Sequence, residues 1–271
     1  PLLESLRSKL LVALRAVPKD NKKGLTELHY PLWQAWTKAA KDPDLEAVQW
    51  LINGAPMGIE EHPKSVGVFP TVSQEESDTN KPIEFSYDNS DFKNYVSLEA
   101  DPMAPKLMED LAKSEFTQSF DTYKEVVAHL NGEPVLSKVA LIVKETGSGK
   151  KYRLILDCSA SGTNSHTRQW ERIVLPRVTD VVDDVLNMMA TARSSSKTNA
   201  VTTSLFVLDF PDALFKIPIA PKERKYFVAK YRGKYIVWTR LPQGSRNGPQ
   251  IFGRFSALIG RLSQSLFDGK D

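Results

Sequence analysis

The sequence contains few of the residues that form disulfide bonds or bind structural metal ions. Its 271 residues include one cysteine, Cys158, and four histidines. A single cysteine excludes an internal disulfide framework and suits a reducing compartment. His29, His62 and His129 stand singly, without the spacing that a histidine-based metal site needs. The composition therefore gives no indication of a small domain held together by disulfide bonds or a metal ion.

Long apolar runs and targeting signals are also absent. No apolar stretch approaches the ~20 residues that a membrane-spanning helix needs, and no signal peptide is visible. We therefore expect no membrane partner and an intracellular location, in the cytoplasm or the nucleus. The first residue is Pro1 instead of methionine, so we expect a processed piece or a segment of something longer.

The charge is distributed unevenly along the chain. The net charge of +3 combines 14 basic and 22 acidic side chains in residues 1–136 with 22 basic and 11 acidic side chains in residues 137–271. The basic C-terminal half indicates a polyanionic partner such as nucleic acid. The alternative is a pair of solvated faces of opposite sign, and charge alone does not decide between them.

The N-terminal part reads as helical. Apolar residues at helical spacing predict helices over residues 2–17, 25–40 and 45–52. Trp33 and Trp36 share one face of the second, where core packing is the favoured interpretation over base stacking. Residues 54–82 are rich in Pro, Gly, Ser, Glu and Asp and predict a linker or an irregular strap. Two further helices are expected at residues 105–114 and 120–130.

A β-hairpin is predicted in the middle of the chain. The apolar run 139–144 and the returning run 151–157 flank a glycine-containing turn at residues 145–150. The turn sequence Gly147-Ser148-Gly149-Lys150 does not match a P-loop, because Lys144 stands where the first glycine is required and Lys151 where Ser or Thr is required.

An acidic helix follows the hairpin. Thr179 is expected to cap a helix that ends near Ala192, with Asp180, Asp183 and Asp184 in its first turns. Acidic side chains at that end favour the helix dipole. We therefore do not interpret this cluster as a metal site.

Two motifs organise the C-terminal half. Residues 202–210 (TTSLFVLDF) predict a strand that delivers Asp209 at its end, and Asp212 follows three residues later. The second motif is residues 241–252 (LPQGSRNGPQIF), where Pro249 is expected to open a helix. Residues 224–229 and 235–238 predict a second hairpin between the two motifs.

These two motifs, in this order after the first hairpin, resemble the reverse transcriptase family of RNA-directed DNA polymerases. The resemblance covers about residues 138–262. It implies that Asp209 is catalytic and that Asp209 and the carbonyl of Phe210 bind two Mg²⁺ or Mn²⁺ ions. It also implies a set of nucleotide-binding residues: Lys144, Arg153, Asp212, Ala213, Leu214, Gln243 and Gly244. In the family, an aromatic residue usually occupies the position of Leu214 and excludes a ribose 2′-hydroxyl.

The implied fold class is α+β, an incomplete right-hand polymerase with fingers and part of the palm after an N-terminal helical extension. The expected division is residues 1–80 for the extension and linker, 81–200 for a fingers-like region and 201–271 for a partial palm. The implied partners are an RNA or DNA template-primer, a dNTP and the remainder of a Pol polyprotein from a retrotransposon. Arg246, Arg254 and Arg261 are expected to add charge for template phosphates.

The family's aromatic-x-Asp-Asp motif is missing from the sequence. We therefore expect two-metal nucleotidyl transfer in the complete parent and no activity in this chain as given. Two alternatives stay open. One is a decayed or domesticated fragment that binds nucleic acid or protein without catalysis, and the other is a template-directed RNA polymerase of the same palm architecture.

Overall fold

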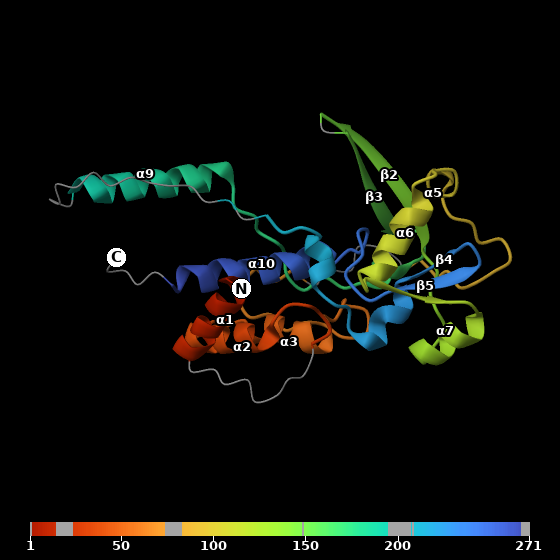
Figure 1. Ribbon diagram of the computed structural model, residues 1–271, viewed down its shortest axis with the longest axis horizontal. Coiled ribbons are helices and arrows are strands. Elements are labelled where there is room, and N and C mark those ends of the chain that lie inside the picture. Colours follow the sequence, from red (N-terminus) through yellow and green to blue (C-terminus); the bar gives the residue numbers. More distant parts are fainter. Residues whose placement is uncertain are drawn as a thin grey trace. The chain divides into compact units, whose positions relative to one another are not determined.

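The structure is a computed structural model, and it describes residues 2–14, 24–73, 83–147, 149–194, 207 and 209–266 (Figure 1). The chain divides into two compact units. Unit 1 comprises Pro1–Arg172 and Asp212–Asp271, and unit 2 comprises Ile173–Pro211. Each unit is described by itself.

Unit 1 combines helices with two small antiparallel sheets. Its α-helices are α1 (Leu2–Ala13), α2 (Tyr30–Ala39), α3 (Leu45–Asn53), α5 (Val96–Glu99), α6 (Ala104–Lys113), α7 (Tyr123–Leu130), α8 (Thr163–His166) and α10 (Gly248–Gln264). Its 3₁₀ helices are η1 (Ala213–Lys216) and η2 (Pro221–Tyr226). Its strands are β1 (Thr117–Phe120), β2 (Lys138–Thr146), β3 (Gly149–Asp157), β4 (Val228–Tyr231) and β5 (Lys234–Trp238). A mixed α and β composition is thereby confirmed.

The predicted first hairpin is present. Strands β2 and β3 pair antiparallel from Lys138 opposite Asp157 to Thr146 opposite Gly149. The β-branched and aliphatic residues of both strands suit this pairing. At the tip, the Thr146 hydroxyl donates to the Gly149 carbonyl at 2.7 Å.

The three-stranded sheet has the order β1-β5-β4, and both of its pairs are antiparallel. The β4–β5 hairpin matches the second part of its prediction, but residues 224–226 belong to η2 instead of a strand. Glu223 contributes to the difference: its buried carboxylate accepts the backbone N–H groups of Met57, Ile59 (3.1 Å), Glu60 (2.6 Å) and Glu61 (3.2 Å). These charge-assisted hydrogen bonds tie Glu223 to residues 57–61, and Pro221 at the start of η2 has the φ that a helical turn needs.

Helix boundaries follow the local caps. The α2 helix begins at Tyr30 instead of Leu25, because His29 Nδ1 accepts from Leu32 N at 3.3 Å and Leu25 N donates to the Leu51 carbonyl at 2.9 Å. Likewise, α7 begins at Tyr123, where Thr122 and Glu125 form a capping box. The residues just before it, 117–120, form strand β1.

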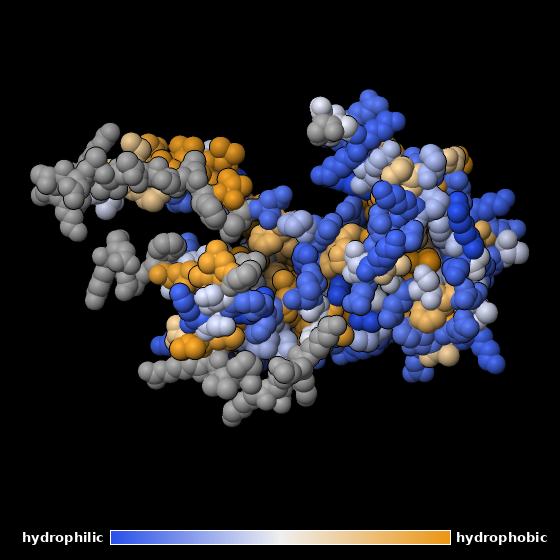
Figure 2. Space-filling view, in the orientation of Figure 1, coloured by the Kyte–Doolittle hydropathy of each residue, from blue (hydrophilic) through white to orange (hydrophobic). Residues whose placement is uncertain are grey.

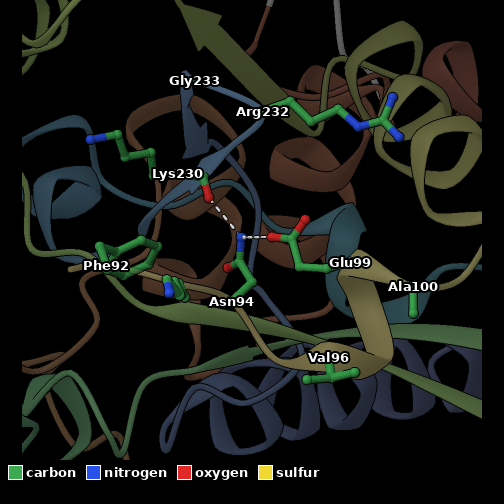
Figure 3. Close-up of a pocket in the computed structure, with 9 residues that line it drawn as sticks. Phe92, Asn94, Val96, Glu99, Ala100, Lys230, Arg232 and Gly233 are labelled. Atoms are coloured by element: carbon green, nitrogen blue, oxygen red, sulfur yellow. Dashed lines mark hydrogen bonds between the residues drawn. The ribbon is translucent and has the colours of Figure 1, made fainter. Parts of the chain in front are cut away.

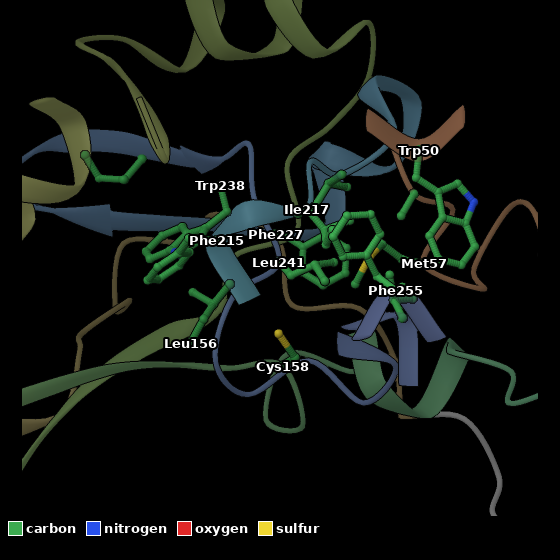
Figure 4. Packing of buried hydrophobic residues seen from close by; sticks show 14 of the residues in the cluster. Trp50, Met57, Leu156, Cys158, Phe215, Ile217, Phe227, Trp238, Leu241 and Phe255 are labelled. Atoms are coloured by element: carbon green, nitrogen blue, oxygen red, sulfur yellow. The ribbon is translucent and has the colours of Figure 1, made fainter. Parts of the chain in front are cut away.

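The main core joins both ends of the sequence (Figure 4). One side of the cluster holds Trp50 from α3, Met57 from the segment after α3, and Phe255 from α10 (Figure 4). The other side holds Phe215 and Trp238 (Figure 4). Helices α2 and α3 therefore bury apolar side chains together with the helix of the second motif. Burial of this kind is the main stabilising term of a domain.

The tryptophan pair of α2 also belongs to this core. Trp33 and Trp36 are partly buried and pack against the main cluster. The ring centroids of Trp33 and Phe255 are 5.4 Å apart, and those of Trp33 and Trp36 are 6.3 Å apart. The core-packing interpretation is confirmed.

Unit 2 contains helix α9 (Val178–Ser194). Arg177 N donates to the Asp180 carboxylate at 2.7 Å, so the side chain that engages the backbone at this end is Asp180. The predicted cap at Thr179 is wrong, because Thr179 already lies inside the helix. Exposed apolar side chains give α9 the orange surface seen in Figure 2: Val178, Val181, Val182, Leu186, Met188 and Met189. Of the strand predicted at residues 202–210, most residues lie outside the described part of the chain.

Within the described ranges, no helix is both long enough and apolar enough to cross a lipid bilayer.

Candidate nucleotide-binding site

A cavity of about 220 Å³ in unit 1 brings together three residues that the motifs single out. Arg153 reaches it from β3, Asp212 from the start of η1, and Gln243 from the second motif. The remaining lining comes from α6, β3 and their surroundings: Leu107, Asp110, Leu111, Ser114, Phe116, Tyr152, Leu154 and Phe215. The cavity therefore presents one guanidinium, two carboxylates and one carboxamide on a wall that is about half polar and half apolar.

Arg153 and Lys144 occupy different levels of the β2–β3 hairpin. Arg153 pairs with Ile142, whereas Lys144 pairs with Lys151, two steps closer to the turn. Both side chains are exposed. Arg153 lines the cavity and Lys144 does not. A role for Lys144 at the same ligand stays a prediction.

The base of the hairpin is fixed by Asp157. Its carboxylate accepts the Tyr95 hydroxyl and the backbone N–H groups of Ser159 and Ala160, the latter two at 3.1 and 3.0 Å. Burial raises the pKa of Asp157, but the hydrogen bonds and the charge of Lys138 outweigh it and lower that pKa overall. The hairpin is thus anchored at the end that leads to the cavity.

Asp212 begins η1 in a left-handed conformation, with φ of 54°. Non-glycine residues adopt this conformation uncommonly, and Asp is among those that tolerate it. Ala213 follows, and Leu214 is half-buried against the main core. Phe215 is buried and stacks on Phe116 with ring centroids 4.8 Å apart. The turn therefore presents Asp212 at the cavity while the next apolar side chains anchor it.

The Gln243–Gly244 turn is held against β3. Leu156 N donates to the Gln243 carbonyl at 2.8 Å. Gly244 has φ of +111°, and a Cβ there would lie 2.1 Å from the Leu156 carbonyl oxygen. Asn164 Nδ2 donates to the Gly244 carbonyl at 3.0 Å, and its Oδ1 accepts from Arg246 N at 2.9 Å. Asn164 therefore ties the second motif to the segment after the hairpin.

We expect Gly244→Ala to lower the free energy of unfolding by at least about 2 kcal/mol, because the added methyl group meets backbone and the φ is unfavourable for alanine. Chemical denaturation measures the difference. Gly260→Ala in α10 is the control, since nothing lies within 4 Å of the position that a Cβ would take there, and it should be neutral or stabilising by up to about 1 kcal/mol. Equal stability of the two variants would contradict the close contact at Gly244.

The two implied metal ligands lie in unit 2. Asp209 is exposed and Phe210 is half-buried. Within the described ranges, no three His, Cys, Asp or Glu side chains are grouped so that they could hold a metal ion. The metal-binding roles of Asp209 and Phe210 therefore stay predictions.

The expected phosphate contact of Arg254 is wrong. Its side chain is fully buried, with Nε 2.6 Å and Nη2 2.8 Å from the Asp44 carboxylate oxygens and Nη2 3.0 Å from Glu46 Oε2. Arg261 Nε likewise donates to Asp42 at 2.7 Å. Sequence alone could not reveal this, because the acidic partners are about two hundred residues away. Arg254 is therefore a structural residue that joins α10 to α3.

Sequence reasoning also missed the contribution of α6. Asp110 and Ser114 line the cavity beside the motif residues. The only signal in the sequence was the amphipathic pattern of a helix, which does not say what its polar face meets. Cys158 is completely buried, and burial raises the pKa of its thiol, so it has the character of a core residue instead of a nucleophile.

No protein-family model matches the chain. It is 40% identical to the Pol polyprotein of feline endogenous virus ECE1 over a 52-residue alignment, which covers 17% of this chain and 5% of that polyprotein. The Gag-Pol polyprotein of baboon endogenous virus (strain M7) is 38% identical over 52 residues, covering 17% of this chain and 3% of that polyprotein. The matches thus span a small fraction of these relatives.

Two solved structures of foamy virus proteins are weakly similar. The protease-reverse transcriptase CSH mutant of prototype foamy virus has a TM-score of 0.39 and 17% identity, over 67% of this chain and 21% of that chain. The foamy viral protease-reverse transcriptase in complex with dsDNA has a TM-score of 0.39 and 14% identity, over 94% of this chain and 41% of that chain. The sequence matches confirm that this chain is related to the Pol polyproteins of retroviruses, as its motifs indicated.

Proposed function

We propose that this chain is the nucleotide-binding part of an RNA-directed DNA polymerase from a Pol-type polyprotein. In this proposal the chain adopts part of a right-hand polymerase fold and acts with a template-primer and a dNTP. The observation that carries the proposal is the cavity shared by Arg153, Asp212 and Gln243. These residues come from separate segments of the sequence, and all three belong to the set that the motifs imply.

The reaction joins a primer 3′-hydroxyl to the α-phosphorus of a dNTP and releases pyrophosphate. In this cavity, Arg153 would bind triphosphate oxygens, since a guanidinium makes charge-assisted hydrogen bonds to phosphate. Gln243 would contact the nucleotide, and the absence of a side chain at Gly244 would let backbone approach the base pair. Asp212 would orient neighbouring backbone or the Arg153 guanidinium. Leu214 would lie beneath the sugar, with its side chain set by the core behind it.

The residues that would hold the implied metal are Asp209 and Phe210. The Asp209 carboxylate and the Phe210 carbonyl are hard oxygen donors, which Mg²⁺ and Mn²⁺ prefer. Asp209 is exposed and therefore accessible to an ion. When bound, the ions would supply charge neutralisation to the reacting phosphates. Asp209 is the one carboxylate that we propose as a metal ligand among the residues that the structure describes.

The test of this proposal is the binding of a fluorescent dNTP, in the presence of Mg²⁺, to this chain. We expect Arg153→Ala to raise the Kd by about 10- to 100-fold, because a charge-assisted contact to phosphate is lost. Lys151→Ala is the matched control, since Lys151 is an exposed cation on the same strand that does not line the cavity. The control should change the Kd less than about threefold.

An unchanged Kd in Arg153→Ala would refute the assignment of the cavity. If nucleic acid still bound to that variant while dNTP binding showed no dependence on Arg153, the non-catalytic nucleic-acid binder would be the better description.

A further inference from the structure

A second cavity of unit 1, about 550 Å³ in volume, lies between the segment before α6 and the β4–β5 turn (Figure 3). Its volume is within the range of about 300–1,000 Å³ that is usual for small-molecule sites. None of its lining residues belongs to the candidate nucleotide site. They are Phe92, Lys93, Asn94, Val96, Glu99, Ala100, Lys230, Arg232 and Gly233.

Asn94 holds the walls of this cavity together. Its Nδ2 donates to Glu99 Oε1 at 3.0 Å and to the Lys230 carbonyl at 2.8 Å (Figure 3). Its Oδ1 accepts from Val139 N at 3.0 Å. The carboxamide thereby connects the turn of α5 to strand β4 and to strand β2. Because β4 is an edge of its sheet, this contact also occupies one of its open carbonyl groups. The cavity is therefore a built feature anchored to the base of the β2–β3 hairpin.

The charges around the cavity favour an anion. Lys230 is balanced by Asp88, whose carboxylate oxygens lie 3.0 and 3.2 Å from its Nζ. Lys93 and Arg232 are exposed, and neither takes part in an ion pair within the described residues. The Arg232 guanidinium lies over the Tyr231 ring, 5.4 Å from its centroid, which restrains it beside the cavity. Glu99 is the one acidic residue of the lining, so Lys93 and Arg232 leave the lining with one net positive charge beside the balanced Lys230.

The rest of the wall is apolar and includes one aromatic ring. Phe92 is half-buried and packs against the smaller core cluster, so its position is fixed. Val96 is 79% exposed and adds apolar surface at the rim. Figure 3 shows Val96 and Arg232 on opposite sides of the Asn94–Glu99 hydrogen bond. Apolar surface with an aromatic ring suits a nucleobase, and cations at the rim suit its phosphates.

We propose that this cavity binds single-stranded nucleic acid, with a base against Phe92 and Val96 and flanking phosphates at Lys93 and Arg232. The proposal rests on the proposed function, because a polymerase handles template beyond the paired duplex. A duplex keeps its bases stacked and paired, so an unpaired strand is the form that can place a base in a concave apolar site. Glu99 also lines the cavity, and its carboxylate can accept from a base amino group, a donor that the side chains of an acidic peptide do not offer.

The experiment measures fluorescence anisotropy of a labelled single-stranded 12-mer and of a blunt 12-base-pair duplex with this chain. We expect the double variant Lys93→Ala/Arg232→Ala to raise the Kd of the single strand about tenfold. It should also reduce the magnitude of the slope of the logarithm of the association constant against the logarithm of the salt concentration by about 1.4, because each of the two lost phosphate contacts contributes about 0.7. The duplex Kd should change less than about twofold. An abasic residue in the 12-mer should weaken its binding to the wild type.

Lys9→Ala/Lys124→Ala is the charge-matched control, because both lysines are exposed on helices α1 and α7, away from the residues that line the cavity. It should leave the single-strand Kd within about twofold, since the long-range effect of two distant surface charges is screened by salt. An unchanged single-strand Kd in the cavity variant, or an equal loss in the control, would overturn the proposal. Displacement of the 12-mer by polyglutamate of equal charge would instead assign the cavity to an acidic protein partner and also overturn it.

Failure here is distinguishable from failure of the polymerase proposal. If the Kd of dNTP depends on Arg153 but the Kd of the single strand does not depend on Lys93 and Arg232, only the assignment of this cavity fails. If the Kd of the single strand depends on Lys93 and Arg232 but the Kd of dNTP does not depend on Arg153, the assignment of this cavity stands and the polymerase proposal fails.

Discussion

Asp209→Asn is expected to lower Mg²⁺-dependent nucleotide incorporation by at least about 10³-fold while it leaves the fold intact. The substitution keeps the shape and one oxygen of the side chain but removes its negative charge. Carboxylate charge is what holds divalent ions in a two-metal reaction, where the ions stabilise the attacking and the leaving oxygens together. Asp209 is exposed, so its replacement should cost little stability.

Primer extension on a poly(rA) template by a longer Pol chain that contains this one measures the effect, because we expect no incorporation by the chain as given. Asp184→Asn is the control, because Asp184 is another exposed acid of unit 2 but lies in helix α9. We expect Asp184→Asn to retain wild-type incorporation, and the thermal transitions of both variants to match the wild type. Substantial incorporation by Asp209→Asn would rule out the proposed metal ligand.

Asp44→Asn is expected to lower the free energy of unfolding by about 3–5 kcal/mol, since it leaves the buried Arg254 without its closest counter-charge. Both side chains of this pair are fully buried. The amide can still cap α3, where the Asp44 side chain accepts from Ala47 N at 3.0 Å. The loss therefore reports on the ion pair and not on the cap. Asp44→Ala removes both interactions and should cost about 1 kcal/mol more.

Chemical denaturation of the variants measures these differences. Asp42→Asn is the control: its carboxylate is also buried, but its partner Arg261 is 28% exposed, so water can still solvate the cation left behind and the loss should be smaller than for Asp44→Asn. Asp44→Leu/Arg254→Met should recover most of the stability that Asp44→Asn loses, since apolar residues of similar volume can replace a buried pair. If Asp44→Asn and Asp42→Asn cost the same, burial is not what makes the Asp44–Arg254 pair important.

The control pair also has a defined pH dependence. Burial alone would raise the pKa of Asp42, but its hydrogen bonds with Arg261 and with Asp44 N, together with the Arg261 charge, lower that pKa overall. The folded-state pKa is thus below the unfolded value. The stabilisation from this pair is therefore present above the unfolded pKa and is lost as the pH falls through the folded pKa.

Local patterns in the sequence were sufficient for several elements. The apolar runs around Gly147 and Gly149 predicted the β2–β3 hairpin, because strand preference and turn chemistry act within a few residues. The helix at residues 45–52 was predicted within one residue of α3, since Asp44 supplies its cap locally. The two C-terminal motifs indicated the relation to Pol polyproteins that the sequence matches confirm.

Other features were decided only by tertiary structure. The short polar segment TQSF became strand β1 because β5 offered it an edge. Arg254 became a core residue because Asp44 and Glu46 lie against it, and α6 came to line the cavity of Arg153. The physical reason is the same in each case. A residue's environment depends on groups far away in sequence, and burial, charge pairing and strand pairing are properties of that environment and not of the local pattern.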